Sequence, residues 1–258
     1  MPLDVQLVRD HFPGREIHWF PTIASTMFEA VRLANAGAPH GTVVGAEEQT
    51  AGHGRYNRAW HSEKESGLYQ TIILRFPIEP SQIPIITMAL GLATAAAIEH
   101  TAAIKCDLRW PNDVMLNEKK TAGILVQLHG SAVVAGIGIN VNQTAFPDDV
   151  TSIATSIAKE TKRTQSREAL LIRLLEEIET HGQIIVDQGI PAILSMFEQT
   201  STYAKGRRVI IDETITGTTN GLTPEGFLKL ITNEGKDHVV LAGGVRPLTG
   251  NWPLTTGH

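Results

Sequence analysis

A glycine-rich loop that carries two arginines and a tryptophan is the part of this sequence best suited to chemistry. It reads GAEEQTAGHGRYNRAW and spans residues 45–60. Closely spaced glycines let backbone N–H groups approach an anion, arginines bind phosphate or carboxylate through two hydrogen bonds, and an indole offers a stacking face. The segment therefore indicates a nucleotide-binding loop, with a plain surface loop as the alternative.

Two common nucleotide motifs do not explain this loop. Gly52, Gly54 and Asn57 almost spell the GxGxxG fingerprint, but residues 58–67 read as a polar loop, whereas that fingerprint opens a helix directly. A GxxxxGK[ST] sequence is absent from the chain. A dinucleotide fold and a P-loop are therefore both disfavoured.

A second candidate segment, LRWPNDVMLNEKKTAGILVQL, spans residues 108–128. Asn117 and Glu118 read as the turn of a β-hairpin, and strand alternation then places Lys120 on one face of the second strand and Lys119 on the other. The predicted neighbours of Lys120 on its face are Ala122, Ile124 and Val126. An inward cation among apolar side chains is unfavourable unless an anion meets it, so Lys120 is a candidate for binding carboxylate and phosphate. The alternative is that Lys120 extends its ammonium group to water.

A third segment, VVAGIGINVN at residues 133–142, alternates glycine with branched side chains. Glycine inside a strand often marks a close approach of a ligand to the backbone, and Asn140 could hydrogen-bond a base edge. A buried strand of the core is the alternative.

Metal and nucleophile signatures are weak. The ten histidines form no HExxH pattern and the single cysteine excludes CxxC, so we expect no metal held by the protein itself. Any Mg²⁺ would be carried by phosphates. Cys106 lies in no nucleophile signature, and we expect it to be buried and inert.

The pattern of apolar residues predicts a first domain at 1–204 that mixes strands and helices. Thr26 followed by Glu29 matches a capping box at a helix start, and residues 83–98 read as a buried helix that is too short to cross a bilayer. The expected strands are 42–48, 68–76, 114–116, 121–128 and 132–141, and the other expected helices are 27–36, 166–180 and 189–200.

Beyond residue 204 the pattern changes to short strands separated by Gly, Asn, Pro and Asp. We expect them to close a small five-stranded barrel at 205–250, followed by a tail at 251–258. The expected strands are 207–212, 214–219, 227–232 and 238–241. Arg246 could reach phosphates or simply end a strand.

Composition narrows the function further. The chain has 258 residues and a formal net charge of −5, which disfavours sequence-independent binding to nucleic acid. One cysteine and no secretory leader pattern favour a cytoplasmic protein. We expect neither nucleic acid nor a membrane as a partner.

Four motifs in order, Ser25-Thr26, EEQTAGHGRYNRAW, RWPNDVMLNEKKTAGIL and GIGINVN, resemble the biotin protein ligase family over nearly the whole chain. The resemblance implies an α+β fold in which a mixed β-sheet is flanked by helices, as in class II synthetases. It also implies a small C-terminal SH3-like barrel. It implies an enzyme that uses ATP, with Mg²⁺ on the phosphates, to convert biotin to biotinyl-5′-AMP. The biotinyl group then passes to a lysine of a biotin carboxyl carrier protein.

The resemblance also implies roles for particular residues. Lys120 and Arg55 would be the catalytic residues. The biotin-binding positions would be Ser25, Thr26, Gln49, Gly52, His53, Gly54, Arg55, Lys120 and Gly123. The nucleotide-binding positions would be Arg55, Arg58, Trp60, Asp113 and Asn140.

The chain departs from the usual family pattern at three positions. His53 stands where an arginine is usual, Met27 where asparagine is common, and Arg109 where lysine is frequent before WPND. Because an unperturbed imidazole titrates near about pH 6.5, the charge of His53 bears on phosphate affinity and on retention of the adenylate.

Because the motif pattern begins almost at once, we expect a monofunctional ligase without an N-terminal DNA-binding domain, and a homodimer is possible. Three alternatives remain. The first is a lipoate or octanoate ligase or transferase, whose usual RRxxGGG-type stretch is absent. The second is a non-catalytic biotin sensor, suggested by His53. The third is an aminoacyl-adenylate enzyme, which would need a surface for tRNA.

Overall fold

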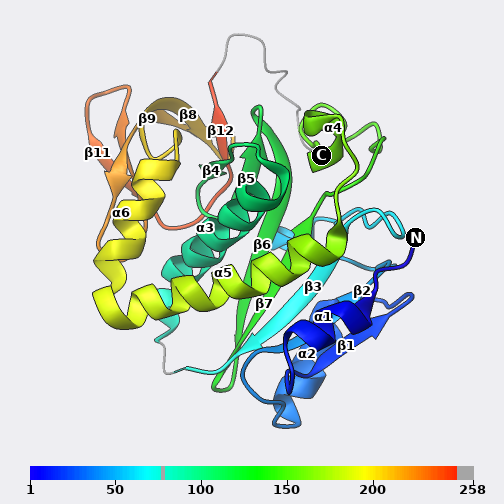
Figure 1. Cartoon of the computed structure of the whole chain (residues 1–258). Helices are drawn as coiled ribbons and strands as arrows, with labels where there is room; N and C mark the ends of the chain where they lie inside the picture. Colours follow the sequence, from blue (N-terminus) through cyan, green and yellow to red (C-terminus); the bar gives the residue numbers. More distant parts are fainter. Residues whose placement is uncertain (77–78, 249–258) are drawn as a thin grey trace.

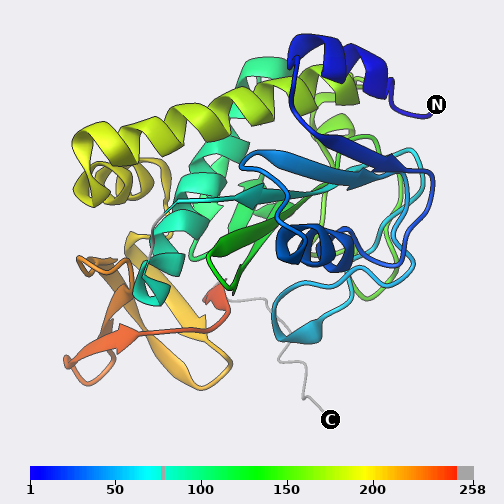
Figure 2. The same cartoon turned by 90° about the horizontal axis from the view of Figure 1, so that it is seen from below.

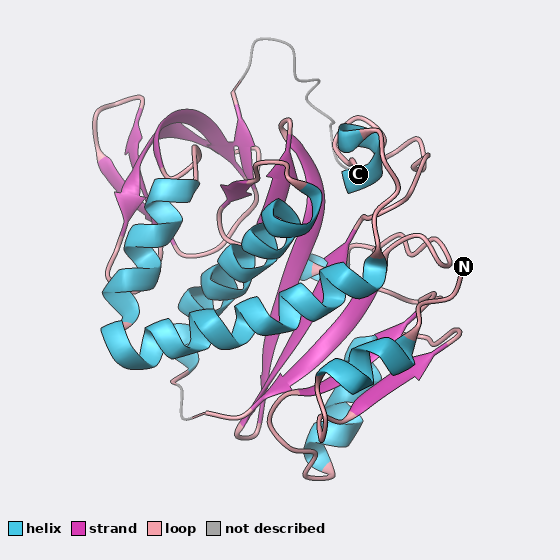
Figure 3. Cartoon of the chain, in the orientation of Figure 1, coloured by secondary structure: helices cyan, strands magenta, loops and turns pink. Residues whose placement is uncertain are grey.

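One mixed β-sheet forms the centre of the larger part of the molecule (Figures 1 and 3). The structure is a computed structural model that describes residues 1–76 and 79–248. The sheet has seven strands in the order β1-β2-β3-β7-β6-β5-β4. Its strands are β1 Ile17–Phe20, β2 Thr42–Ala46, β3 Leu68–Leu74, β4 Asp107–Arg109, β5 Asp113–Leu116, β6 Lys119–His129 and β7 Ala132–Ile139. β1 and β2 pair in parallel and the other neighbours pair antiparallel, which confirms the predicted mixed sheet.

Helices cover both faces of this sheet (Figure 2). On one face α3, Ile83–Ala102, packs between the sheet and α5, Arg167–Gln188, while α6, Ile190–Thr200, packs beside both helices. α1, Val5–His11, contacts α5. On the other face α2, Thr26–Asn35, contacts β2, β3 and β7. The short helix α4, Ile157–Thr161, precedes α5.

The helix α3 is apolar on all sides because both of its faces are covered. Fourteen of its residues are buried, from Ile85 to Ala102. By length and composition alone the stretch Pro80–Ala102 is apolar enough to span a membrane, but most of it is buried within the protein. The predicted buried helix at residues 83–98 is confirmed, but the prediction that it is too short to cross a bilayer is wrong, because the helix continues to Ala102.

A second, antiparallel sheet begins at Lys205 and has the order β11-β10-β9-β8-β12. Its strands are β8 Lys205–Ile211, β9 Ile215–Leu222, β10 Leu228–Thr232, β11 Asp237–Val240 and β12 Val245–Pro247. The five strands match the predicted C-terminal β module, although no pairing in residues 1–76 and 79–248 closes the sheet into a barrel. The division at 204/205 stays a prediction, and the predicted tail lies outside the described residues.

Several local predictions are wrong. The elements α1, β1, β4 and α4 are present but were not predicted, and α5 continues to Gln188 rather than stopping at 180. The capping box is also absent, because Ser25 rather than Thr26 is the N-cap residue and makes no side-chain cap bond. Glu29 pairs with Arg32 instead, at 2.7 Å. Thr26 is therefore free to use its hydroxyl elsewhere.

Candidate active site

A row of directly paired residues crosses the face of the large sheet that α2 covers in part. Its members are Tyr69 in β3, Gly138 in β7, Gly123 in β6, Asp113 in β5 and Arg109 in β4. Paired residues project to the same face of a sheet, so the two glycines leave bare backbone between Tyr69 and Asp113. That bare strip is where the backbone lets a large group approach closely.

The indole of Trp60 lies over the two glycines. An ideal Cβ at Gly138 would come within 2.6 Å of the ring, and one at Gly123 within 3.1 Å. The backbone N–H of Trp60 donates to the carbonyl of Gly52 at 2.9 Å, which ties the ring to the glycine-rich loop. Its indole Nε1 is buried beside Gly138 and has no hydrogen-bond partner among the described residues.

Lys120 lies beside Trp60 on the same face. Its Nζ is 2.6 Å from Asp113 Oδ1 and 5.3 Å from the centre of the indole ring. An ideal Cβ at Gly123 would lie 2.8 Å from this Nζ. The ammonium group is thus held at the edge of the bare strip, where a negatively charged ligand would meet it.

The predicted face of Lys120 is wrong, and a β-bulge is the reason. Met115 pairs with Lys120 but Val114 pairs with Ala122, so Thr121 is an extra residue on β6. An extra residue breaks the simple alternation of side chains. Lys120 therefore shares a face with Gly123, whereas Ala122 and Ile124 are buried in the core beside α3.

Asp113 is held as a carboxylate by two cations. Besides Lys120, Arg109 Nη2 donates to Asp113 Oδ2 at 2.6 Å. Burial acts to raise the pKa of Asp113, but the charges and hydrogen bonds of Lys120 and Arg109 outweigh it and bring the pKa down to about 2. The carboxylate therefore stays charged at neutral pH and fixes the position of the lysine ammonium.

A polar cluster lies at the start of α2. The backbone N–H of Thr26 and its hydroxyl donate to Gln49 Oε1 at 2.9 and 3.0 Å. Thr26 Oγ1 also lies 2.8 Å from Thr71 Oγ1, and Gln49 Nε2 donates to Ser62 Oγ at 3.3 Å. Ser25, Thr26, Thr71 and Ser62 are all buried. Four polar side chains in a buried position can recognise a polar, uncharged ligand group.

The glycine-rich loop folds back on itself at residues 54–58. Gly54 N–H donates to the Arg58 carbonyl at 2.8 Å, and the turn between them contains Tyr56 and Asn57, both with φ of +56°. Gly52 has a tight environment, because a Cβ there would come within 3.1 Å of Gln49 Nε2. His53 packs on the ring of Phe28, with ring centres 5.3 Å apart.

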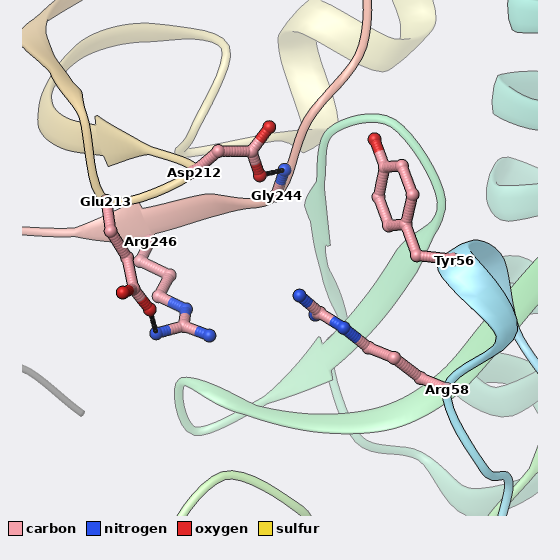
Figure 4. A pocket seen from close by; sticks show the side chains of 6 residues that line it. All are labelled: Tyr56, Arg58, Asp212, Glu213, Gly244 and Arg246. Carbon is pink, nitrogen blue, oxygen red and sulfur yellow. Dashed lines mark hydrogen bonds and ion pairs between the residues drawn. The ribbon is translucent and has the colours of Figure 1, made fainter. Parts of the chain in front are cut away.

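The two arginines of the loop point toward the C-terminal sheet. Arg55 Nη1 donates to Asn112 Oδ1 at 3.2 Å and to the Gly243 carbonyl at 3.3 Å. Arg58 lines a cavity of about 380 Å³ (Figure 4). The other lining residues are Tyr56, Asp212, Glu213, Gly244 and Arg246.

Arg246 is one of the residues that line this cavity, and its predicted contact with phosphates stays a prediction. This residue lies in β12, and its Nη1 donates to Glu213 Oε1 at 2.9 Å. Figure 4 shows the guanidinium groups of Arg58 and Arg246 on opposite sides of the cavity. Arg246 therefore belongs to a strand and lines the cavity as part of an ion pair with Glu213. No contact of the described residues joins Arg58 or Arg246 to Lys120.

Asn140 follows β7 and is buried. Its Nδ2 donates to the Thr155 carbonyl at 3.0 Å, and its backbone N–H donates to the Thr121 carbonyl at 2.7 Å. The backbone of Asn140 is thereby bonded to the start of β6, and its side chain is bonded to the segment before α4. A role in reading a base stays a prediction.

Ser62 and Thr71 complete the polar cluster and were not predicted. Glu47 and Arg167 were not predicted either, and their side chains form a buried ion pair of 2.8 Å beneath the loop. The strand alternation of β3 could have indicated Thr71, whereas no local signal points to Arg167. Cys106 is buried, and burial raises the pKa of its thiol, as expected for an inert cysteine. Among the described residues, no group of three or more His, Cys, Asp or Glu side chains could hold a metal.

Several known proteins are similar to this chain in sequence and in fold. A family model described as the biotin/lipoate A/B protein ligase family matches residues 19–143. The bifunctional ligase/repressor BirA of Bacillus subtilis (strain 168) is 36% identical over 234 residues, which are 86% of this chain and 71% of the relative. The biotin–[acetyl-CoA-carboxylase] ligase of Mycobacterium tuberculosis is 30% identical over 262 residues and covers 95% of each chain.

Among solved structures, the biotin protein ligase of Aquifex aeolicus in complex with biotin and ATP superposes with a TM-score of 0.80. It is 30% identical in sequence and the match covers 90% of this chain and 97% of that one. The fold and the family model define a ligase of the biotin and lipoate class. Within that class, the extent of these matches shows that the chain belongs to the biotin protein ligase family.

Proposed function

We propose that this chain uses ATP to activate biotin and then attaches the biotinyl group to a lysine of a carboxylase carrier protein. In the first step the biotin carboxylate attacks the α-phosphorus of ATP, the bond to pyrophosphate breaks, and biotinyl-5′-AMP forms. In the second step the neutral amine of the carrier lysine attacks the acyl carbon, the bond from that carbon to AMP breaks, and the nitrogen loses a proton to solvent, so that an amide, AMP and a proton result. The names of the relatives support both the substrates and the kind of partner.

The single observation that carries the proposal is the position of Lys120 beside Trp60 and the bare glycine strip. A fixed cation near a reacting carboxylate and phosphate stabilises the negative charge that grows in the transition state. Because Asp113 and Arg109 hold Lys120 in place, its orientation is set before the substrates bind. We assign it the central catalytic role, with Arg55 as the second cation.

We assign biotin to the polar cluster and the nucleotide to the other side of Trp60. Ser25, Thr26 and Gln49 would meet the ureido ring, whose N–H and C=O groups match hydroxyl and amide partners. Asn140 and Arg58 would meet the adenine and the phosphates. Holding both substrates in one orientation removes much of the entropic barrier to their reaction.

The partner is proposed as a biotin carboxyl carrier domain, recognised as a folded domain that presents its lysine. We also propose that two copies of the chain pair as a homodimer, as symmetric association is the commonest assembly. Sedimentation at increasing protein concentration tests the second point, and a monomer at all concentrations would reject it.

The first experiment is transfer of labelled biotin to a carrier domain in the presence of ATP and Mg²⁺. Labelled carrier is expected, together with one pyrophosphate released for each biotin consumed. Release of pyrophosphate with lipoate but not with biotin would favour the lipoate alternative. Biotin binding without any pyrophosphate release would favour a non-catalytic sensor.

A further inference from the structure

A buried guanidinium group lies beneath the substrate loop. Arg167 is the first residue of α5, and its side chain is 5% exposed. Its Nη1 donates to Glu47 Oε2 at 2.8 Å and to the Gly67 carbonyl at 3.1 Å, and its Nη2 donates to the Met1 carbonyl at 2.6 Å. One side chain thus binds three segments that are distant in the sequence.

Two of these three partners are the two ends of the same loop. Glu47 comes directly after β2 and Gly67 directly before β3, so the connection between them carries every predicted site residue from Gln49 to Trp60. The backbone N–H of Glu65 also donates to the Glu47 carbonyl at 3.1 Å. Arg167 therefore closes the base of the connection 47–67.

The Glu47 carboxylate is fully engaged. Its Oε1 accepts from the Leu3 N–H at 2.9 Å and from Trp19 Nε1 at 2.7 Å, while its Oε2 accepts from Arg167. These bonds satisfy the buried carboxylate and guanidinium, and they hold the two ends of the connection 47–67 in one arrangement.

Stability alone is a poor explanation for this pair. Taking two charges out of water offsets most of their attraction, and apolar replacements of similar size are often neutral or stabilising. A connection of this length with little regular structure has many possible conformations, and such loops are usually functional. The main effect of the Arg167–Glu47 pair is therefore to hold the two ends of the loop close together.

We propose that Arg167 is a positioning residue for the substrate loop. It acts through Glu47 and Gly67, which set where Gln49 and Trp60 lie relative to Thr26 and the glycine strip. It touches no substrate itself. The effect on catalysis rests on the proposed function, whereas the effect on the loop does not.

The experiment compares Arg167→Lys with a matched control, Arg173→Lys, in the full chain. Arg173 is on the same helix but pairs with Glu176 and Glu177 of that helix, away from the loop. Two readouts are needed. The first is hydrogen–deuterium exchange of the loop amides 48–66 without ligands, and the second is KM and kcat for biotin and ATP.

In Arg167→Lys we expect exchange of the loop amides to rise by about tenfold, the change that follows from losing 1.4 kcal/mol of local stability. We expect KM for biotin to rise by a similar factor of about ten, with a smaller change in kcat. Arg173→Lys is expected to leave both readouts close to wild type.

Unchanged loop exchange in Arg167→Lys would overturn the proposal, as would equal increases over the whole chain in both variants. Faster loop exchange together with no biotin adenylation by the wild type would support the positioning role and reject the proposed function. If Arg167→Lys does not fold, the double variant Glu47→Gln/Arg167→Met removes both charges together. The same selective loosening of the loop is expected of it, and a loop as protected as in wild type would overturn the proposal.

Discussion

Asp113 Oδ1 lies 2.6 Å from Lys120 Nζ, and Asp113 Oδ2 lies 2.6 Å from Arg109 Nη2. One carboxylate thus has a cation on each oxygen. The arrangement lets Lys120 be removed without leaving Asp113 unpaired, because Arg109 stays in place. Replacing Lys120 therefore tests its chemical role without also breaking the ion pair between Asp113 and Arg109.

Lys120→Ala is expected to lower biotin transfer by about 100- to 1000-fold, the loss typical of removing one group that stabilises transition-state charge. The measurement is the initial rate of labelled biotin transfer to a carrier domain. The control is Lys119→Ala, since the Lys119 side chain reaches the Thr151 carbonyl at 3.5 Å rather than Asp113. Equal rates in Lys120→Ala and wild type would remove the lysine from the mechanism.

Acid should weaken the Asp113 ion pairs in a defined range of pH. The folded-state pKa of about 2 is below the ordinary value of 3.8, so the contribution to stability is complete above about pH 4 and is lost as the pH falls from 4 toward 2. The size of that contribution is about 2 kcal/mol. Urea unfolding of wild type and Asp113→Asn should therefore show a difference in unfolding free energy at pH 6 that shrinks below pH 4. A difference independent of pH would show that the charge of Asp113 is not its source.

Gly138→Ala should displace Trp60. A Cβ placed 2.6 Å from the indole cannot be accommodated without movement of the ring, and such overpacking typically costs about 1–3 kcal/mol. We expect weaker ATP binding in the presence of biotin, measured by isothermal titration. Gly182→Ala is the control, because nothing lies within 4 Å of a Cβ at this position of α5 and alanine favours a helix. ATP affinity equal to wild type in Gly138→Ala would contradict the assigned place of Trp60.

Thr26→Val removes the hydroxyl that bonds Gln49 and Thr71 while keeping the shape of the side chain. Loss of a buried hydrogen-bonding partner typically costs about 1–3 kcal/mol, so KM for biotin should rise by about tenfold or more with little change in KM for ATP. Steady-state kinetics with each substrate varied separately gives both values. Thr22→Val is the control, because Thr22 is exposed and bonds Glu48 outside the buried cluster. A rise in KM for ATP of the same size would place Thr26 outside the biotin subsite.

Much of the fold was predictable where local signals were strong. The two-residue hairpin at Asn117 and Glu118 has φ values of +46° and +64°, the left-handed conformations that favour such a turn. The buried helix α3 and the apolar strands β2, β3 and β7 also followed from the pattern of apolar residues along the chain. By contrast, α1 buries Val8 as its one fully covered residue and β1 has four residues, two of which are half-buried aromatic side chains. Elements so short and so partly exposed carry little periodic signal.

Local sequence patterns were also insufficient to predict individual side-chain contacts in the site. Strand alternation predicted an inward Lys120, but the extra residue Thr121 reversed its face, and no feature of the local sequence marks a bulge at that position. The pairing of Arg167 with Glu47 joins residues 120 positions apart. Such a contact depends on the packing of α5 over the sheet, which local patterns do not contain.

The glycine strip also bears on how this protein can vary. Gly123 and Gly138 are directly paired on neighbouring strands, and a side chain added to either one would enter the space of the same indole ring. Positions 60, 123 and 138 should therefore vary together. A larger residue at either glycine position requires a smaller side chain at position 60. Related chains that replace one of these glycines should carry a compensating change at the tryptophan, and a chain that keeps the tryptophan should keep both glycines.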